Sequence, residues 1–310
     1  MSKILKKYSP SQIFVYSGVS KVNIFMQLIK YGFHRLIGTR FVETNVNNYR
    51  MKLDFKTLGL SKVLYIYGTR EIPDTYIAKT EIKPGMVVAD IGANIGYYSL
   101  IEALAVGETG HVYAFEPDPR NIQLLRDNIA LNKMDDRVTV YEQAVSDKKE
   151  RKTFQLGTRS NVSSFVDRPD VVGAVEVDCI ALHEFEHIEE VDMLRMDAEG
   201  YECKIIEGVM PYLRSNKKPF KIMLEVHPKE YNDTDLNFKQ NLKELFEIGF
   251  TVSHVVANKP HRSVYADLGY RPVISYSETR HIRDVYHNIS HTDVLNLCDG
   301  KVRSIVIVRV

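Results

Sequence analysis

The chain has 310 residues, of which 44% are hydrophobic and 26% are charged, with 41 basic against 40 acidic residues. This is the composition of a globular protein with a buried core. The net charge of +1 excludes a long-range electrostatic attraction of the whole molecule to nucleic acid or to a membrane surface. No apolar run approaches the roughly 18 residues of a membrane-spanning helix. Three scattered cysteines and the absence of a signal-peptide pattern predict a cytoplasmic protein without disulfides.

Residues 1–67 are predicted to form an N-terminal extension of helix and strand. Apolar residues recur at helical spacing from Val22 to Ile37, which favours a helix packed on the core or on a second subunit. Basic residues beside this stripe leave a membrane-surface helix open as the alternative. Residues 51–67 have a strand-like pattern with glycines as punctuation.

A buried strand over residues 87–91 runs into a glycine turn and then a helix. Gly92 and Gly96 let a ligand approach the backbone, and the free N–H groups of the following helix favour a polar or anionic ligand group. The turn lacks the Gly-x-Gly-x-x-Gly of a dinucleotide site. We expect the carboxylate of Asp90 to point into the same crevice, where it suits a cation such as the amino group of S-adenosylmethionine.

The strand at residues 111–115 ends in Glu116, which is placed to accept the two hydroxyls of a ribose. Together with Asp90, this favours a methyl donor over a nicotinamide as the bound cofactor.

The rest of the chain alternates strands and helices. We expect the further core strands at residues 138–142, 191–196, 220–226, 250–256 and 303–310. This pattern predicts a seven-stranded, doubly wound α/β sheet with an antiparallel last strand, and ligands beyond the carboxyl ends of its strands. A small, polar connection at residues 157–173 joins two strands of a hairpin, and a long insertion at residues 257–301 separates the last two core strands.

These motifs, in their order and spacing, resemble the FkbM family of S-adenosylmethionine-dependent methyltransferases. The resemblance is carried by residues 68–75, 82–85, 90–96, 115–119, 128–132, 144–147, 196–202 and 225–227. It implies a Rossmann-like class I methyltransferase fold over residues 68–310, with S-adenosylmethionine as cofactor.

The resemblance also implies which residues surround the ligands. The candidate cofactor-binding residues are Glu71, Asp90, Gly92, Asn94, Gly96, Glu116, Pro117, Gln143, Ala144 and Asp197. The connection at 157–173 resembles a loop near the family's active site, so its candidate substrate-binding residues are Ser160, Asn161, Ser163 and Ser164. A plain turn is the alternative for this connection, and for the segment at Glu71 the alternative is that Asp74 or Thr75 is simply a helix cap.

An alcohol that attacks a sulfonium methyl needs a proton acceptor. His227, just past a strand, has a suitable intrinsic pKa, so we predict it as general base, with Asp197 and Glu199 shaping the acceptor side. A purely structural pairing of His227 with Glu225 or Glu199 is the alternative. No set of metal ligands is evident, and metal dependence stays open.

The expected activity is O-methylation of a hydroxyl on a sugar, a glycan precursor or another small metabolite, without a nucleic-acid partner. A nucleic-acid methyltransferase would be expected to carry an Asn/Asp-Pro-Pro-Tyr/Phe motif, where this chain has Asp197-Ala-Glu-Gly. A non-catalytic S-adenosylmethionine-binding assembly protein is the other alternative, and a homo-oligomer is compatible with the sequence.

Overall fold

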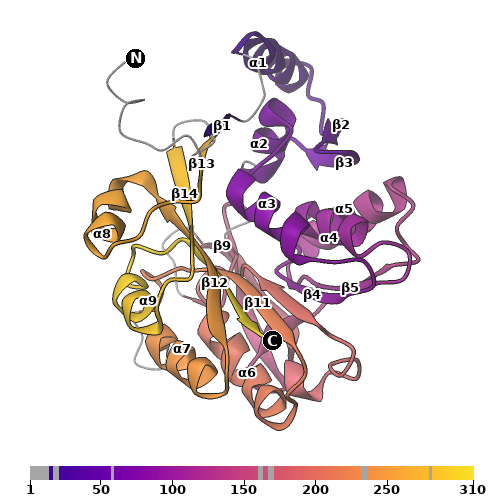
Figure 1. The fold of residues 1–310 in the computed structure, drawn as a ribbon. Helices are drawn as coiled ribbons and strands as arrows, with labels where there is room; N and C mark the ends of the chain where they lie inside the picture. The colour runs from indigo at the N-terminus through magenta and orange to yellow at the C-terminus, as the bar shows by residue number, and fades with distance from the viewer. Residues whose placement is uncertain are drawn as a thin grey trace, which may run out of the picture.

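The computed structural model describes residues 14–16, 21–56, 59–159, 163–166, 171–231, 236–278 and 281–310. A mixed β-sheet forms its centre, with helices on both faces, which confirms the predicted α/β class (Figure 1).

The middle of this sheet has the strand order β12-β15-β11-β10-β4-β5-β6. The bounds are β4 Val87–Ile91, β5 His111–Phe115, β6 Val138–Tyr141, β10 Met193–Met196, β11 Phe220–Glu225, β12 Thr251–Asn258 and β15 Ser304–Arg309. β15 runs antiparallel to β11 and β12, whereas β11, β10, β4, β5 and β6 are parallel to one another. The predicted reversal of the last strand is therefore confirmed, and the parallel strands end along one edge, where ligands bind in such folds.

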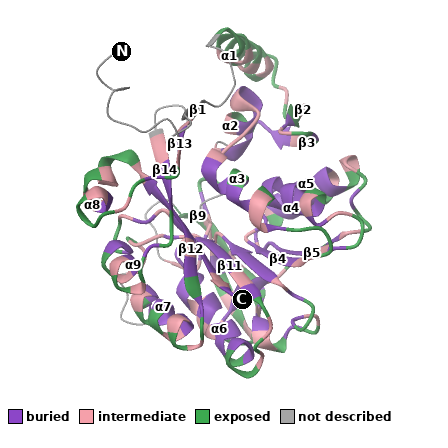
Figure 2. Cartoon of the chain, in the orientation of Figure 1, coloured by how far each residue is buried: buried purple, intermediate pink, exposed green. Residues whose placement is uncertain are grey.

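Two apolar cores lie on the two faces of the sheet. One face is covered by α4 and α5 and the other by α6 and α7, with their buried sides toward the strands (Figure 2). These helices span Tyr97–Val106, Pro119–Leu131, Glu202–Ser215 and Phe238–Glu247. Asp118 begins α5 by accepting a hydrogen bond from the backbone N–H of Arg120, and Asn237 does the same for α7 through Gln240. Such caps satisfy helix N–H groups that have no partner within the helix.

In the described residues the sheet has ten strands and not the seven that we predicted, because the insertion at residues 257–301 adds two and the N-terminal segment adds one. The insertion forms η4 Lys259–His261, α8 Arg262–Asp267, β13 Ile274–Glu278, β14 His281–His287 and α9 His291–Leu297. β14 pairs antiparallel with β12, β13 with β14, and β1 (Phe14–Tyr16) pairs parallel with β13. Without them β12 would be an edge strand with unpaired backbone groups, and an added hairpin satisfies those groups.

The N-terminal part of the chain packs beside α4 and α5. It comprises α1 Lys21–Leu36, β2 Phe41–Val46, β3 Tyr49–Asp54, α2 Leu60–Tyr67 and α3 Ile72–Glu81. The strand-like interpretation of residues 51–67 is correct only for β3. Residues 60–67 form a helix, because their apolar side chains pack on one side into the core and Gly68 ends the helix in a left-handed conformation at φ 67°.

A second, three-stranded sheet stands beside the main one. It contains β7 Ala144–Ser146, β8 Glu150–Gly157 and β9 Val171–Ala181, followed by η3 Leu182–Glu184. β8 and β9 are antiparallel, which confirms the predicted hairpin around the polar connection. Of that connection, Ser163 and Ser164 are described, whereas Ser160 and Asn161 lie outside the described residues.

Within the described ranges, no helix has the length and the apolar character to cross a membrane. Cys179, Cys203 and Cys298 are free and buried.

Candidate active site

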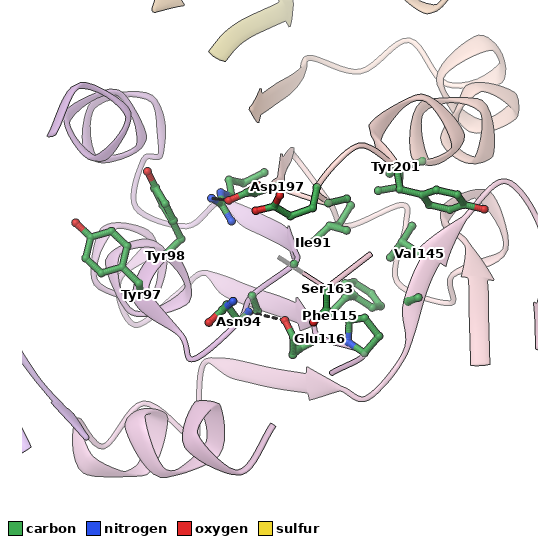
Figure 3. A pocket seen from close by; sticks show the side chains of 18 of the residues that line it. Ile91, Asn94, Tyr97, Tyr98, Phe115, Glu116, Val145, Ser163, Asp197 and Tyr201 are labelled. Atoms are coloured by element: carbon green, nitrogen blue, oxygen red, sulfur yellow. Dashed lines mark hydrogen bonds and ion pairs between the residues drawn. The ribbon is translucent and has the colours of Figure 1, made fainter. Parts of the chain in front are cut away.

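A cavity lies at the carboxyl ends of β4, β5 and β10, where the sequence places its ligands (Figure 3). It has about 830 Å³ of space between its walls, open solvent at its mouth included. The predicted residues that line it are Glu71, Gly92, Asn94, Glu116, Pro117, Gln143, Ala144, Ser163, Asp197 and Glu199. The structure therefore brings together residues that are up to 128 positions apart, from Glu71 to Glu199.

The glycine turn owes its glycines to contacts within the protein. A Cβ at Gly92 would lie 2.2 Å from the backbone oxygen of Asp197, and a Cβ at Gly96 would lie 2.9 Å from Leu125. Both glycines also have positive φ, 79° and 90°, which disfavours other residues. Gly92 lines the cavity and Gly96 does not, so the close approach expected for a ligand is, in this structure, an approach of chain segments to each other.

Glu116 lies directly after β5 at the cavity wall, as predicted. Its Oε2 accepts a hydrogen bond from the backbone N–H of Asn94 at 2.6 Å, and its Oε1 accepts one from the N–H of Asp118 at 2.9 Å. Burial raises the pKa of Glu116 to about 7, although these N–H donors act in the opposite direction. The carboxylate is therefore tied to the glycine turn while it still faces the cavity.

Asp90 does not face the crevice, which corrects our expectation. It is fully buried on β4, opposite Arg195 of β10, and its Oδ1 lies 3.3 Å from Nη1 of Arg195. Its Oδ2 accepts a hydrogen bond from the hydroxyl of Ser99 at 2.6 Å. These partners hold the carboxylate in the interior, so a direct contact with a cofactor stays a prediction.

Arg195 was missed by the sequence reasoning, although an arginine inside the otherwise apolar stretch Met193–Met196 was a visible signal. It lines the cavity, lies 3.8 Å from the ring centroid of Tyr98, and its Nη2 is 3.4 Å from Oδ2 of Asp197. Arg195 therefore links the interior acid Asp90 to the cavity acid Asp197.

Glu71 begins α3 in a left-handed conformation, with φ 49°. Its Oε1 lies 2.7 Å from Nη2 of Arg70 and accepts a hydrogen bond from Nη2 of Arg303 at 2.9 Å. Glu71 is the N-cap residue of α3, and its side chain makes no capping hydrogen bond. Glu71 lines the cavity as an acid paired with two arginines.

The described serines of the polar connection are engaged by the protein itself. The Ser163 hydroxyl donates to Oδ2 of Asp118 at 2.8 Å and accepts from Nη2 of Arg120 at 2.8 Å. The Ser164 hydroxyl donates to the backbone oxygen of Glu199 at 2.9 Å and is buried away from the cavity. Ser164 is therefore not placed to contact a substrate, whereas Ser163 stays a candidate.

His227 lies beside Asp197 and Glu199, just outside the residues that line the cavity. Its Nδ1 is 2.9 Å from Oε1 of Glu202, while its Nε2 faces carboxylates of Asp197, Glu199 and Glu225 at 3.7 to 3.9 Å. An imidazole with one nitrogen held by a buried carboxylate and the other nitrogen facing a site is the arrangement of an oriented base. The structure therefore brings the three predicted catalytic residues together.

Glu202, at the start of α6, is the residue that sequence reasoning did not assign. It is fully buried, accepts hydrogen bonds from the backbone N–H groups of Ala198 and Gly200, and accepts one from the hydroxyl of Tyr231 at 2.8 Å. Its position in the motif at residues 196–202 was visible, but the turn of its side chain back toward His227 was not.

Charge around His227 decides its protonation. Burial by itself would lower the pKa of the imidazole, but Glu202, followed by Glu225 and Asp197, outweighs burial and raises the pKa to about 10. Burial and the nearby Asp197 raise the pKa of Glu225 to about 8. With these neighbours, His227 is mostly a cation at neutral pH.

Asp197, Glu225 and His227 each offer one atom that could ligate a metal ion, and these atoms lie within 4.8 Å of one another. Glu225 already forms an ion pair of 2.9 Å with Arg303, and Asp197 lies beside Arg195. Protein cations thus balance these carboxylates in the structure as it stands.

Comparisons with known proteins give the family context of this site. A model of the methyltransferase FkbM domain matches residues 90–272. Over 61 residues the chain is 36% identical to the ribosomal protein L11 methyltransferase of Carboxydothermus hydrogenoformans, a match that covers 20% of this chain and only 19% of that relative.

Several solved structures have a similar fold. TYW2 of Pyrococcus horikoshii in complex with MeSAdo has a TM-score of 0.44 at 14% identity and covers 96% of this chain and 88% of its own. A SAM-dependent O-methyltransferase of Thermotoga maritima has a TM-score of 0.40 at 17% identity, with coverages of 77% and 65%. The methyltransferase FkbM of Methylobacillus flagellatus has a TM-score of 0.39 at 15% identity, with coverages of 73% and 54%. At these scores the likenesses carry no argument about substrates.

Proposed function

Because the chain belongs to the FkbM methyltransferase family and is an S-adenosylmethionine-dependent methyltransferase, we propose that it methylates a hydroxyl of a sugar, a glycan precursor or another small metabolite. The observation that carries this proposal is the pair of His227 and Glu202, which lies just outside the cavity lining, with Nε2 of His227 3.8 Å from Oδ1 of the cavity residue Asp197. A hydroxyl needs a proton acceptor as it attacks, whereas a carboxylate acceptor would need only positioning.

The residues that would hold S-adenosylmethionine are those around the glycine turn. Glu116 would accept ribose hydroxyls, and Gln143 and Ala144, which line the cavity after β6, would frame the adenine. Asp197 supplies negative charge beside the cavity, which suits a cationic ligand group. The bound cofactor supplies a methyl group on a sulfonium, a strong electrophile.

On the acceptor side, Nε2 of His227 would take the hydroxyl proton while Glu202 stabilises the imidazolium that forms. The raised pKa makes this imidazole a strong base but leaves only a small part of it unprotonated at neutral pH. A positive charge brought into this acidic surrounding would lower that pKa and enlarge the active fraction. Asp197 and Glu199, whose carboxylates lie 3.8 and 3.9 Å from Nε2, would position the acceptor.

The charge of the chain supports a small acceptor over a nucleic acid. Its net charge is +1, so the molecule as a whole has no positive field that would attract a phosphate backbone. We therefore place nucleic acid outside the proposed substrates.

Calorimetric titration of the purified chain with S-adenosylmethionine and S-adenosylhomocysteine, with NAD as control, tests the donor site. Transfer of a radiolabelled methyl group to panels of sugars, glycolipids and RNA then tests the acceptor class. Methylation of RNA alone would overturn the proposed class, because the labelled product identifies the acceptor directly.

The variant His227→Gln tests the base. We expect kcat to fall about 10²-fold or more while the affinity for S-adenosylmethionine stays unchanged. The matched control is His261→Gln, which removes an imidazole in η4, outside the site. Near wild-type turnover of His227→Gln with the true substrate would contradict the assignment.

A further inference from the structure

Helix α1 has two different apolar faces. The inner face, with Ile24 and Tyr31, attaches the helix to the fold: the ring of Tyr31 lies 4.9 Å from that of Phe55 at an angle of 67°. On the same side, Nη1 of Arg35 donates to the backbone oxygen of Phe55 at 2.8 Å. One side of the helix is therefore enough to hold it in place.

The opposite face is an exposed apolar stripe. Its members and their exposed fractions are Val22 69%, Phe25 62%, Met26 47%, Ile29 51%, Phe33 58% and Leu36 84%. At 100° per residue these positions span about 100° of the helix circumference, and Ile24 and Tyr31 lie on the other side. Figure 2 shows this helix at the outside of the molecule, mostly exposed. Large aromatic and aliphatic side chains gathered in this way mark an interaction surface.

The charge around the stripe has one sign. The first 42 residues contain seven lysines and arginines and no aspartate or glutamate, whereas the rest of the chain contains 34 basic and 40 acidic residues. The net charge of +1 therefore conceals a basic N-terminal segment on an otherwise acidic protein. Lys30 is exposed within α1 itself, and Arg40 follows the helix.

We propose that α1 is a docking helix for an anionic lipid bilayer, which it contacts with the stripe from Val22 to Leu36 while the flanking lysines and arginines meet lipid head groups. A helix with an apolar face and basic flanks lies in the plane of a membrane interface, and each basic residue near an anionic surface adds to the attraction. A second copy of the chain fits less well, because two such helices would bring two wholly basic segments together.

The test is co-sedimentation of the full chain with phosphatidylglycerol vesicles and with phosphatidylcholine vesicles. The variants are Phe25→Ser with Phe33→Ser, and separately Lys30→Gln. Leu268→Ser is the matched control, because it removes another exposed apolar side chain, next to α8. Urea unfolding of each variant shows whether the fold is kept, and sedimentation velocity without lipid reports the oligomeric state.

We expect the wild type and the Leu268→Ser control to bind phosphatidylglycerol vesicles, with weak binding to phosphatidylcholine and loss of binding at high salt. Loss of each phenylalanine should weaken binding about tenfold or more, and Lys30→Gln about fivefold. Equal binding by the wild type and the folded Phe25/Phe33 variant overturns the proposal. The proposal is also overturned if the wild type is a dimer that does not bind vesicles and the Phe25/Phe33 variant is a monomer. The stripe would then be the contact between two copies of the chain.

Discussion

The pairing of His227 with Glu202 makes a prediction that requires no knowledge of the acceptor. Replacing Glu202 by Gln keeps the shape of the side chain and removes the charge that lies 2.9 Å from Nδ1 of His227. In the wild type, carboxylates hold the pKa of His227 at about 10. The variant is expected to titrate at a lower pH.

The size of the change follows from the strength of the contact. A hydrogen bond to a charged group contributes about 1.5 to 3 kcal/mol, and one unit of pKa corresponds to about 1.4 kcal/mol. Loss of the Glu202 charge should therefore lower the pKa of His227 by about one to two units. Glu225 and Asp197 remain near Nε2 and keep the pKa above that of a free imidazole.

The assay is an NMR titration of the histidine side chains from pH 5.5 to 10.5, with the His227 signal identified by its loss in His227→Gln. Glu207→Gln, which removes a carboxylate of α6 paired with Lys204, is the matched control and should leave the titration unchanged. Equal midpoints in the wild type and in Glu202→Gln, or a wild-type midpoint near 6.5, would refute the reasoning.

Further predictions concern cofactor binding, stability and metal. Glu116→Gln should weaken S-adenosylmethionine binding by about 1.5 to 3 kcal/mol in calorimetry, and unchanged affinity would remove Glu116 from the site. Gly92→Ala should cost about 2 to 5 kcal/mol in urea unfolding, through its positive φ and the contact with the Asp197 oxygen, whereas Gly68→Ala, left-handed at φ 67° and ψ 2° with its nearest neighbour at 3.8 Å, should cost only about 1 to 2 kcal/mol. The pKa of His227 in the folded protein lies above that of an unfolded histidine. Its contribution to the free energy of unfolding should therefore be complete below about pH 6.5 and be lost as the pH rises through about 10. Urea unfolding of the wild type and of His227→Gln at these two pH values would measure this contribution. Methyl transfer should persist in excess EDTA, because protein cations already balance the acidic cluster, and loss of activity that Mg²⁺ restores would contradict this.

Residues that directly follow strands were predictable from sequence. Glu116, Asp197 and His227 each come after a short apolar run, and parallel strands bring such positions to one edge of a sheet. The glycine turn was recognisable for the same local reason. The contact that requires a glycine at position 92 was not predictable, because the atom nearest to a Cβ there belongs to Asp197, more than a hundred residues away in the sequence.

The misplacement of Asp90 has a comparable cause. The sequence shows an acid at the end of a strand, but whether it faces the crevice depends on the partner opposite it, and the register that sets Arg195 against Asp90 exists only in the folded sheet. The orientation of Glu202 likewise depends on where His227 arrives from the neighbouring strand.

Short elements were the least predictable. Residues 60–67 are rich in Val, Ile and Tyr, which have strand propensity, yet they form a helix because the core offers a partner for one helical face. The strands β13 and β14 form because they supply hydrogen-bond partners for the edge of β12. The sequence pattern of the insertion alone does not show which edge it will pair with.

The contact between Gly92 and Asp197 has an evolutionary consequence. Because not even a methyl group fits between the donor turn and the end of β10, these two segments can change only together, and single substitutions in either are costly. In its described residues, the connection between β8 and β9 contacts the segment after β10 through the Ser164 hydroxyl on the Glu199 carbonyl and through the ring of Phe165, 4.7 Å from that of Tyr201. We therefore expect substitutions that change the acceptor to accumulate in that connection, while the glycine turn and the end of β10 stay the same among related proteins.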